Sequence, residues 1–136
     1  MESTIFILIV DNDIQVRNRL GQLLKRRGYE IAGVNTDEEA LSFLKSNNVD
    51  LIIIDLALPG KCGFDLLPTV KETFPEIAII AATPYGDAHS VKKALKMGAD
   101  EYLTKPFRDQ EITLVVERVC WRFLSHQSRP SPIPIP

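Results

Sequence analysis

The chain has 136 residues, of which 45% are hydrophobic and 25% are charged, and this composition indicates one globular domain and excludes a fibrous or disordered chain. The 16 Lys and Arg nearly balance the 18 Asp and Glu, for a net charge of -2, so direct binding to nucleic acid is not expected. The longest apolar run, 5–10, is too short to cross a membrane. The two cysteines form neither a CxxC pair nor a disulfide framework, which suits a protein of the cytoplasm.

Short apolar runs alternate with helical patterns along the chain. The runs predicted to be strands are 4–10, 30–34, 51–54, 77–82 and 101–103. Three of them, 4–10, 51–54 and 77–82, are apolar without alternation, which is typical of parallel strands that helices cover on both faces. The pattern predicts an α/β fold with an open, doubly wound parallel sheet of five strands flanked by five helices.

Helix signals fill the gaps between these strands. The first helix is expected to begin after Asp13, its N-cap, and to end near Gly28. The second begins with the capping-box pattern at 36–39. The other three are expected at 64–73, 88–97 and 109–125. Because Pro68 cannot continue a helical hydrogen-bond ladder, the third helix either begins near Pro68 or is kinked there.

The chain divides into a domain and a short end segment. We expect residues 1–125 to fold as the domain described above. The end at 126–136 has a proline at every second position from 130 onward, which favours an extended chain, so we expect a flexible tail or the start of a linker.

Polar side chains follow four of the predicted strands. The segment 11–13 (Asp-Asn-Asp) follows the first, Asp55 the third, Thr83 the fourth and Lys105 the fifth. Each has an ordinary reading, such as a solvated loop acid or a surface charge, but the carboxyl ends of parallel strands meet at one edge, where ligands bind. Carboxylates beside a lysine and a hydroxyl suit Mg²⁺ together with the oxygens of an anion. This arrangement is suited to phosphoryl transfer.

Four segments carry a resemblance to a known family. They are ILIVDNDIQVR (7–17), IIIDLALPGKCGFDLL (52–67), IIAATPYGD (79–87) and ADEYLTKPF (99–107). In motif order and spacing, residues 4–124 are similar to the receiver domains of two-component response regulators. The resemblance implies a flavodoxin-like fold with strand order 2-1-3-4-5.

The resemblance also implies a function. Asp55 would accept a phosphoryl group from a sensor histidine kinase or a phosphotransfer protein. Mg²⁺ would be held by Asp11, Asn12, Asp55 and the backbone carbonyl of Ala57, and it would neutralise charge that repels the incoming group. Such a protein is not a turnover enzyme and catalyses no more than its own phosphorylation and dephosphorylation.

Other residues would read out the modification in such a receiver. Lys105 would pair with Asp55 at rest and with a phosphoryl oxygen afterwards. Thr83 would move toward the phosphoryl group, and Tyr102 would follow it from an exposed to a buried position. The bond between Lys105 and Pro106 is expected to be cis, as it is in the family.

Two positions depart from the family pattern. Asn12 stands where a second carboxylate is usual, so we expect weaker Mg²⁺ binding and an easier ionisation of Asp55. Pro84 stands where a small residue donates its backbone N–H to the phosphoryl group, and proline has none. These departures leave open a pseudo-receiver, which would keep the fold and act as a binding module without phosphorylation.

A second apolar patch is expected on the last helix. Leu114 and Trp121 are seven residues apart and lie away from its main apolar stripe. In receivers the face formed here by 88–97, 101–103 and 109–125 is the usual partner surface, so the resemblance implies a homodimer or partner contact through Leu114 and Trp121. The alternative is that Trp121 folds over the edge of its own domain.

The acidic motif after the first strand also resembles that of haloacid-dehalogenase phosphatases. There Asp11 would be the nucleophile and Asp13 the acid and base. Those motifs usually continue with Gly-Thr or Gly-Val, whereas 14–15 is Ile-Gln here, and Asp55 would have no role. Hydrolysis of p-nitrophenyl phosphate that requires Asp11 but not Asp55 would favour this alternative.

Overall fold

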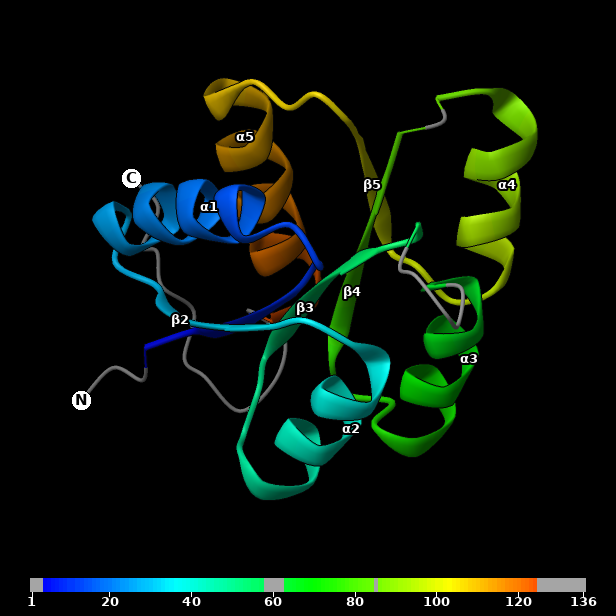
Figure 1. Ribbon diagram of the computed structural model, residues 1–136, viewed down its shortest axis with the longest axis horizontal. Helices are drawn as coiled ribbons and strands as arrows, with labels where there is room; N and C mark the ends of the chain where they lie inside the picture. The colour runs from blue at the N-terminus through cyan, green and yellow to red at the C-terminus, as the bar shows by residue number, and fades with distance from the viewer. Residues whose placement is uncertain (1–3, 58–62, 85, 125–136) are drawn as a thin grey trace.

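The computed structural model describes residues 4–57, 63–84 and 86–124. Its strands are β1 (Phe6–Val10), β2 (Glu30–Val34), β3 (Leu51–Asp55), β4 (Ala78–Thr83) and β5 (Glu101–Thr104). All neighbouring strands are parallel, in the order β2-β1-β3-β4-β5, which confirms the predicted sheet (Figure 1). The α-helices are α1 (Ile14–Arg26), α2 (Asp37–Ser46), α3 (Gly63–Thr73), α4 (Ala88–Lys96) and α5 (Asp109–Val119), and a π-helical turn, η1 (Cys120–Leu124), follows α5.

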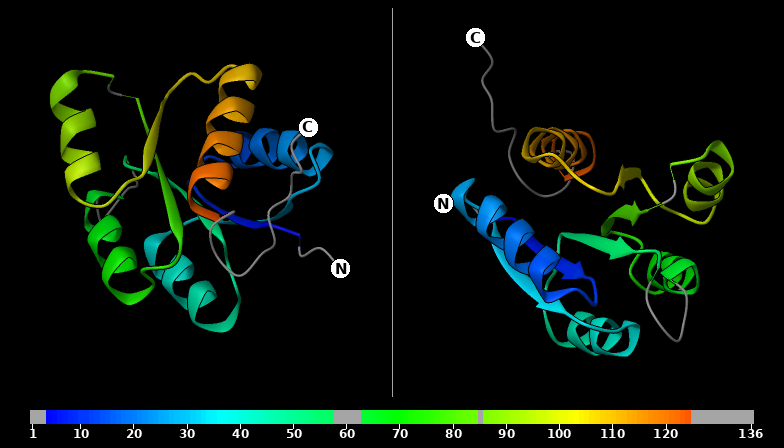
Figure 2. Two further views of the ribbon diagram at one scale, coloured as in Figure 1. Left: turned by 180° about the vertical axis from the view of Figure 1, so that it is seen from behind. Right: turned by 45° about the horizontal axis from the view of Figure 1, so that its top comes forward.

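Helices cover both faces of the sheet (Figure 2). Alternate side chains of a strand point to opposite faces, so Ile7 of β1 joins the core under α1 and α5, whereas Leu8 joins the core under α2, α3 and α4. Both side chains are fully buried. This two-sided burial explains why the central strands lack polar alternation.

The strand ends differ slightly from the prediction. β1 begins at Phe6 rather than Thr4, because its neighbour β2 begins level with Phe6, at Glu30. β3 and β4 each extend one residue further than expected, to Asp55 and Thr83, since both remain paired with a neighbouring strand there. Two candidate functional residues therefore belong to the sheet itself.

The predicted helix ends at α1 and α2 are confirmed. The Asp13 side chain accepts a hydrogen bond from the Gln15 N–H at 2.9 Å, and Gly28 follows the C-cap of α1 with φ of 96°. Thr36 and Glu39 form the reciprocal capping box of α2. These caps fix where the loops after β1 and β2 turn into helices.

Two later helices refine the predictions. The third helix, expected at 64–73, spans Gly63–Thr73 and contains Pro68, so the alternative that it begins near Pro68 is wrong. The proline removes one backbone hydrogen bond, but the buried side chains of Leu67 and Val70 hold the helix against the sheet. The helix expected to reach residue 125 is α-helical only to Val119 and then π-helical to Leu124.

Acidic residues at the amino end of the sheet have structural roles. Asp50 accepts the Phe6 N–H at 2.9 Å, and Asp100 accepts the Ile79 N–H at 2.8 Å. Both carboxylates satisfy backbone donors at the start of a strand.

In the part of the chain that the structure describes, none of the helices combines the length and the hydrophobicity needed to span a membrane. The predicted tail at 126–136 lies outside those residues.

Candidate functional site

The predicted residues meet at the carboxyl end of the sheet. Asp11 directly follows β1, Asp55 ends β3, Thr83 ends β4 and Lys105 directly follows β5. Asp11, Asp55 and Thr83 are 2%, 3% and 1% exposed. Burial this deep is rare for carboxylates unless they are paired, and it excludes the reading of Asp11 as a solvated loop acid.

Lys105 joins the two carboxylates. Its Nζ donates to Asp11 Oδ2 at 2.9 Å and lies 3.3 Å from Asp55 Oδ2. The expected pair with Asp55 is therefore present, and the shorter contact is with Asp11. The Lys105 N–H donates to the Thr83 carbonyl at 2.8 Å, which places Thr83 beside this cluster. The Lys105–Pro106 bond is cis, as predicted.

Each carboxylate has one oxygen bound by the backbone and one that faces Lys105. Asp11 Oδ1 accepts the Asp13 N–H at 2.9 Å, and Asp55 Oδ1 accepts the Ala57 N–H at 3.0 Å. The backbone therefore orients both carboxylates so that their second oxygens converge on the ammonium group. Two buried acids share one lysine, which leaves the cluster with a negative charge.

The pKa values of Asp55 and Lys105 reflect this arrangement. Burial is the largest cause of the raised pKa of Asp55, and the charge of Asp11 adds to it, whereas the Ala57 N–H and Lys105 oppose it. Burial also disfavours the charge on Lys105, but the hydrogen bond to Asp11 and the charges of both acids outweigh it, so its pKa is raised. With Asn12 in place of a carboxylate, Asp55 is expected to ionise more easily than it would beside a second acid. This difference stays a prediction.

The donor set is suited to a hard divalent cation. Asp11 and Asp55 offer carboxylate oxygens, Asn12 is exposed and offers an amide oxygen, and the net charge of the cluster is negative. Among the described residues, no group of three or more His, Cys, Asp or Glu side chains is arranged to hold a metal. Asn12 contributes an amide oxygen to this donor set rather than a carboxylate. The residues therefore fit Mg²⁺ with one negative charge fewer than the family pattern.

A family comparison identifies this arrangement. The model of the response regulator receiver domain matches residues 7–117. The chain belongs to this family. Two curated relatives are the DNA-binding transcriptional regulator NtrC of Azospirillum brasilense, 34% identical over 128 residues, and the transcriptional regulatory protein CpxR of Escherichia coli K12, 33% identical over 122 residues. These matches cover 94% and 90% of the chain but 26% and 51% of the relatives, so the chain spans between a quarter and half of their length.

Solved receiver domains share the fold. The signal receiver domain of an HD domain-containing protein from Pseudomonas fluorescens Pf-5 has a TM-score of 0.84 and 31% identity, with 90% of this chain and 99% of that chain covered. The BeF3-activated DrrB receiver domain has a TM-score of 0.80 and 28% identity, with 88% and 100% covered. The match therefore extends over nearly all of each solved domain.

Tyr102 and Pro84 lie close in sequence to Lys105 and Thr83. Tyr102, in β5, is 39% exposed, which agrees with the expected exposed resting position. Pro84 directly follows Thr83 and is exposed. Beside the site is a hollow of about 550 Å³, whose lining includes Asp13, Pro84 and Lys105. Of the cluster residues, Lys105 is the one that lines this hollow.

The expected apolar patch on the last helix is exposed. Leu114 is 58% exposed and Trp121 is 52% exposed, so about half of each side chain is accessible. Glu101 of β5 forms ion pairs with Arg118 at 3.1 Å and with Arg122 at 3.2 Å. These ion pairs connect β5 with the end of α5 and with η1.

Two arginines of α1 that were not among the predicted site residues contact the site loops. Arg17 donates to the Asp11 carbonyl at 2.6 Å. Arg19 donates to the Phe107 carbonyl at 2.5 Å and to Asp109 Oδ1 at 2.9 Å, so it ties α1 to the loop that carries Lys105. In the sequence both are ordinary polar residues of an amphipathic helix, and no local signal marks them.

Proposed function

We propose that this receiver domain accepts a phosphoryl group on Asp55 from the phosphohistidine of a sensor histidine kinase or a phosphotransfer protein. The observation that carries the proposal is the geometry of Lys105, whose Nζ lies 3.3 Å from Asp55 Oδ2 and 2.9 Å from Asp11 Oδ2 in a buried acidic cluster. A nucleophilic carboxylate beside a fixed cation is the arrangement that transfer to a carboxylate requires.

The chain's own residues account for most of the proposed step. A carboxylate oxygen of Asp55 attacks phosphorus, the P–N bond of phosphohistidine breaks, and an O–P bond forms to give an acyl phosphate. Lys105 needs no large movement to neutralise a phosphoryl oxygen. Asp11, Asn12, Asp55 and the Ala57 carbonyl would hold Mg²⁺, which when bound reduces the repulsion between the two anions.

The modification would then change a contact surface. A phosphoryl group adds about two negative charges and three acceptor oxygens, and Thr83, whose backbone carbonyl accepts the Lys105 N–H, carries a hydroxyl that could donate to one of those oxygens. We expect Thr83 to turn toward the phosphoryl group and Tyr102 to become buried behind it. Because Tyr102 lies in β5, this change would alter the face formed by α4, β5 and α5.

The pseudo-receiver is the second candidate, and two observations favour it. Asn12 leaves the site without a third carboxylate, and Pro84 has no N–H to offer a phosphoryl oxygen. Both changes weaken the support for a modified Asp55. In this alternative the domain would bind its partner in the same way with or without a phosphodonor.

Incubation with Mg²⁺ and acetyl phosphate, followed by intact-mass measurement, tests the proposal. We expect the mass of one phosphoryl group in the wild type and none in Asp55→Asn. Asp65→Asn is the matched control, because Asp65 is an exposed acid in the first turn of α3. This variant should react like the wild type. A wild type that gains no mass would favour the pseudo-receiver. A gain that survives Asp55→Asn, with p-nitrophenyl phosphate turnover that needs Asp11, would favour a dehalogenase-type phosphatase.

We also propose that Leu114 and Trp121 are contact residues for a homodimer or a partner. Their support is their exposure on α5 and η1, beside β5. Trp121→Ala should weaken association in sedimentation experiments, whereas Ile14→Ala should not, since Ile14 is equally exposed but lies on α1. Unchanged self-association and unchanged partner affinity in Trp121→Ala would remove this proposal.

A further inference from the structure

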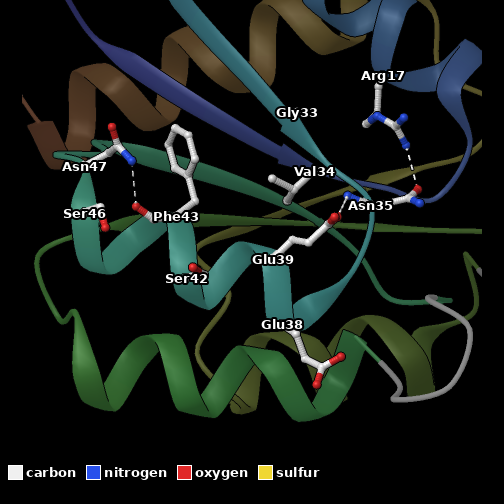
Figure 3. A pocket seen from close by; sticks show the side chains of 10 residues that line it. All are labelled: Arg17, Gly33, Val34, Asn35, Glu38, Glu39, Ser42, Phe43, Ser46 and Asn47. Atoms are coloured by element: carbon white, nitrogen blue, oxygen red, sulfur yellow. Dashed lines mark hydrogen bonds between the residues drawn. The ribbon is translucent and has the colours of Figure 1, made fainter.

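Arg17 connects the acidic loop after β1 to the turn after β2. One guanidinium nitrogen, Nη1, donates to the Asp11 carbonyl at 2.6 Å and to Asn35 Oδ1 at 2.9 Å. A single NH₂ group carries two hydrogens, so it can serve both acceptors. Figure 3 shows the Arg17 side chain directed at Asn35 beside the end of β2. Arg17 and Asn35 both line a hollow of about 790 Å³. Neither Asp11 nor Asp55 lines it, so this hollow is separate from the acidic cluster.

Asn35 is itself held in place. Its N–H donates to Glu39 Oε1 at 2.7 Å, and the same oxygen accepts the Thr36 N–H at 3.2 Å. Glu39 and Thr36 also form the capping box of α2, so the position of Asn35 is fixed by the start of a helix (Figure 3). The Arg17 guanidinium therefore connects Asn35, whose backbone is held by Glu39, to the Asp11 carbonyl.

Gly33 leaves room for this span. A Cβ at position 33 would lie 3.1 Å from Arg17 Cδ, which is tighter than ordinary van der Waals contact. The stem of Arg17 thus passes directly over the backbone of β2. A side chain at this position would require the Arg17 stem to shift by a few tenths of an ångström.

The backbone of Asp11 is fixed on both sides. Its N–H donates to the Val34 carbonyl at 3.2 Å, which continues the pairing of β1 with β2. Its carbonyl, held by Arg17, belongs to the peptide bond between Asp11 and Asn12. The orientation of that peptide plane sets the direction in which the Asn12 side chain leaves the backbone.

We propose that Arg17 is a positioning residue for the cation site. It holds the peptide between Asp11 and Asn12 so that the Asp11 carboxylate and the Asn12 amide are presented to the same space as Asp55. The inference rests on the proposed function, since it concerns the site that would hold Mg²⁺. Interactions of this kind orient metal ligands, and their loss typically weakens metal affinity by about 10–100-fold.

The direction in which Mg²⁺ affinity changes when Arg17 is replaced distinguishes a positioning role from a simple effect of its charge. A positive charge near a cation site repels the cation, so by charge alone the loss of Arg17 would tighten Mg²⁺ binding. By positioning, the same loss weakens binding because Asp11 and Asn12 are no longer oriented together. The two explanations therefore predict opposite changes in the dissociation constant.

The test is a titration with Mg²⁺ alone, followed by the amide resonances of residues 11–13 and Ala57. Arg17→Met should raise the dissociation constant about tenfold, and Arg17→Lys, which keeps the charge but lacks the planar fork, should raise it as well. Arg26→Met is the matched control, since Arg26 lies at the far end of α1 and donates to Gln22, and it should leave the constant unchanged. Unchanged amide resonances in β3 and β4 will show that the variants keep the fold.

A second variant checks the anchor. Asn35→Ala should weaken Mg²⁺ binding in the same direction, and the double variant with Arg17→Met should bind no more weakly than Arg17→Met alone, because both changes break one span. Additive effects, or an Arg17→Met variant that binds as tightly as the wild type or more tightly, would overturn the inference. A wild type that shows no Mg²⁺-dependent shift would instead contradict the proposed function.

Discussion

Lys105→Met is expected to destabilise the apo protein by about 3 kcal/mol at pH 7. The ammonium lies 2.9 Å from Asp11 Oδ2 and 3.3 Å from Asp55 Oδ2, and at an effective dielectric constant of about 20 these pairs give roughly 6 and 5 kcal/mol of gross attraction. Desolvation offsets much of this, and removing one partner of a buried pair typically costs about 3–5 kcal/mol. The Lys105 side chain is 23% exposed, which places the expected loss at the lower end.

The pH dependence has a defined sign. The folded-state pKa of Lys105 is raised, so its stabilisation is fully present at pH 7 and is lost only as the pH rises through that folded value. In the variant, both acids remain buried without the ammonium, and the pKa of Asp55, already raised by burial, rises further. The folded variant then binds protons more readily than its unfolded state, so the destabilisation should shrink as the pH falls from 7 to 5.

Urea unfolding followed by circular dichroism measures these differences. The variants are Lys105→Met, Asp55→Asn and the double change, with Lys92→Met as a control for an exposed lysine, expected within about 0.5 kcal/mol of the wild type. In the Asp55→Asn background, Lys105→Met should cost roughly half as much, because the longer contact with Asp55 carries slightly less than half of the attraction. A loss below about 1 kcal/mol at pH 7, or an equal loss in both backgrounds, would refute the reasoning.

Three further predictions concern Asn12, Pro84 and Asp100. Asn12→Asp should tighten Mg²⁺ binding about tenfold in a calorimetric titration, since one more charge beside a cation near the surface contributes on the order of 1–2 kcal/mol; unchanged affinity would show that position 12 does not face the cation. Pro84→Ala restores a backbone N–H, and because hydrogen bonds to charged groups are worth about 1.5–3 kcal/mol, the acyl phosphate should decay about tenfold more slowly in a mass time course. Equal decay would mean that this N–H does not reach the phosphoryl group. Asp100→Ala removes the acceptor of the Ile79 N–H at 2.8 Å and should cost about 1–2 kcal/mol in urea unfolding while the reaction with acetyl phosphate stays unchanged; slower phosphorylation would contradict the structural role of this acid.

The architecture was predictable because its signals are local. Apolar runs without alternation indicate covered parallel strands, and the topology then places whatever follows those strands at one edge. Asp11, Asp55 and Lys105 are far apart in the sequence, yet this rule alone was enough to bring them together, and the structure places them in one cluster. The cis bond before Pro106 followed from the family resemblance.

Other features depend on contacts that local sequence does not specify. The span from Arg17 to Asn35 requires α1 to lie against the end of β2, and no pattern in either segment marks the pair. The shorter contact of Lys105 with Asp11 depends on the rotamers of three buried side chains. Pro68 lies inside α3 because tertiary packing outweighs one lost hydrogen bond. Sequence patterns therefore located the site, and packing determined its internal geometry.

The most direct test of the central claim is to locate the phosphorylated residue. After reaction with acetyl phosphate and Mg²⁺, borohydride reduces an aspartyl phosphate to homoserine, and peptide mass spectrometry then identifies its position. The account predicts homoserine at position 55 and nowhere else, with none when Mg²⁺ is chelated. Homoserine at position 11, or none at position 55 while an established receiver domain reacts under the same conditions, would contradict it.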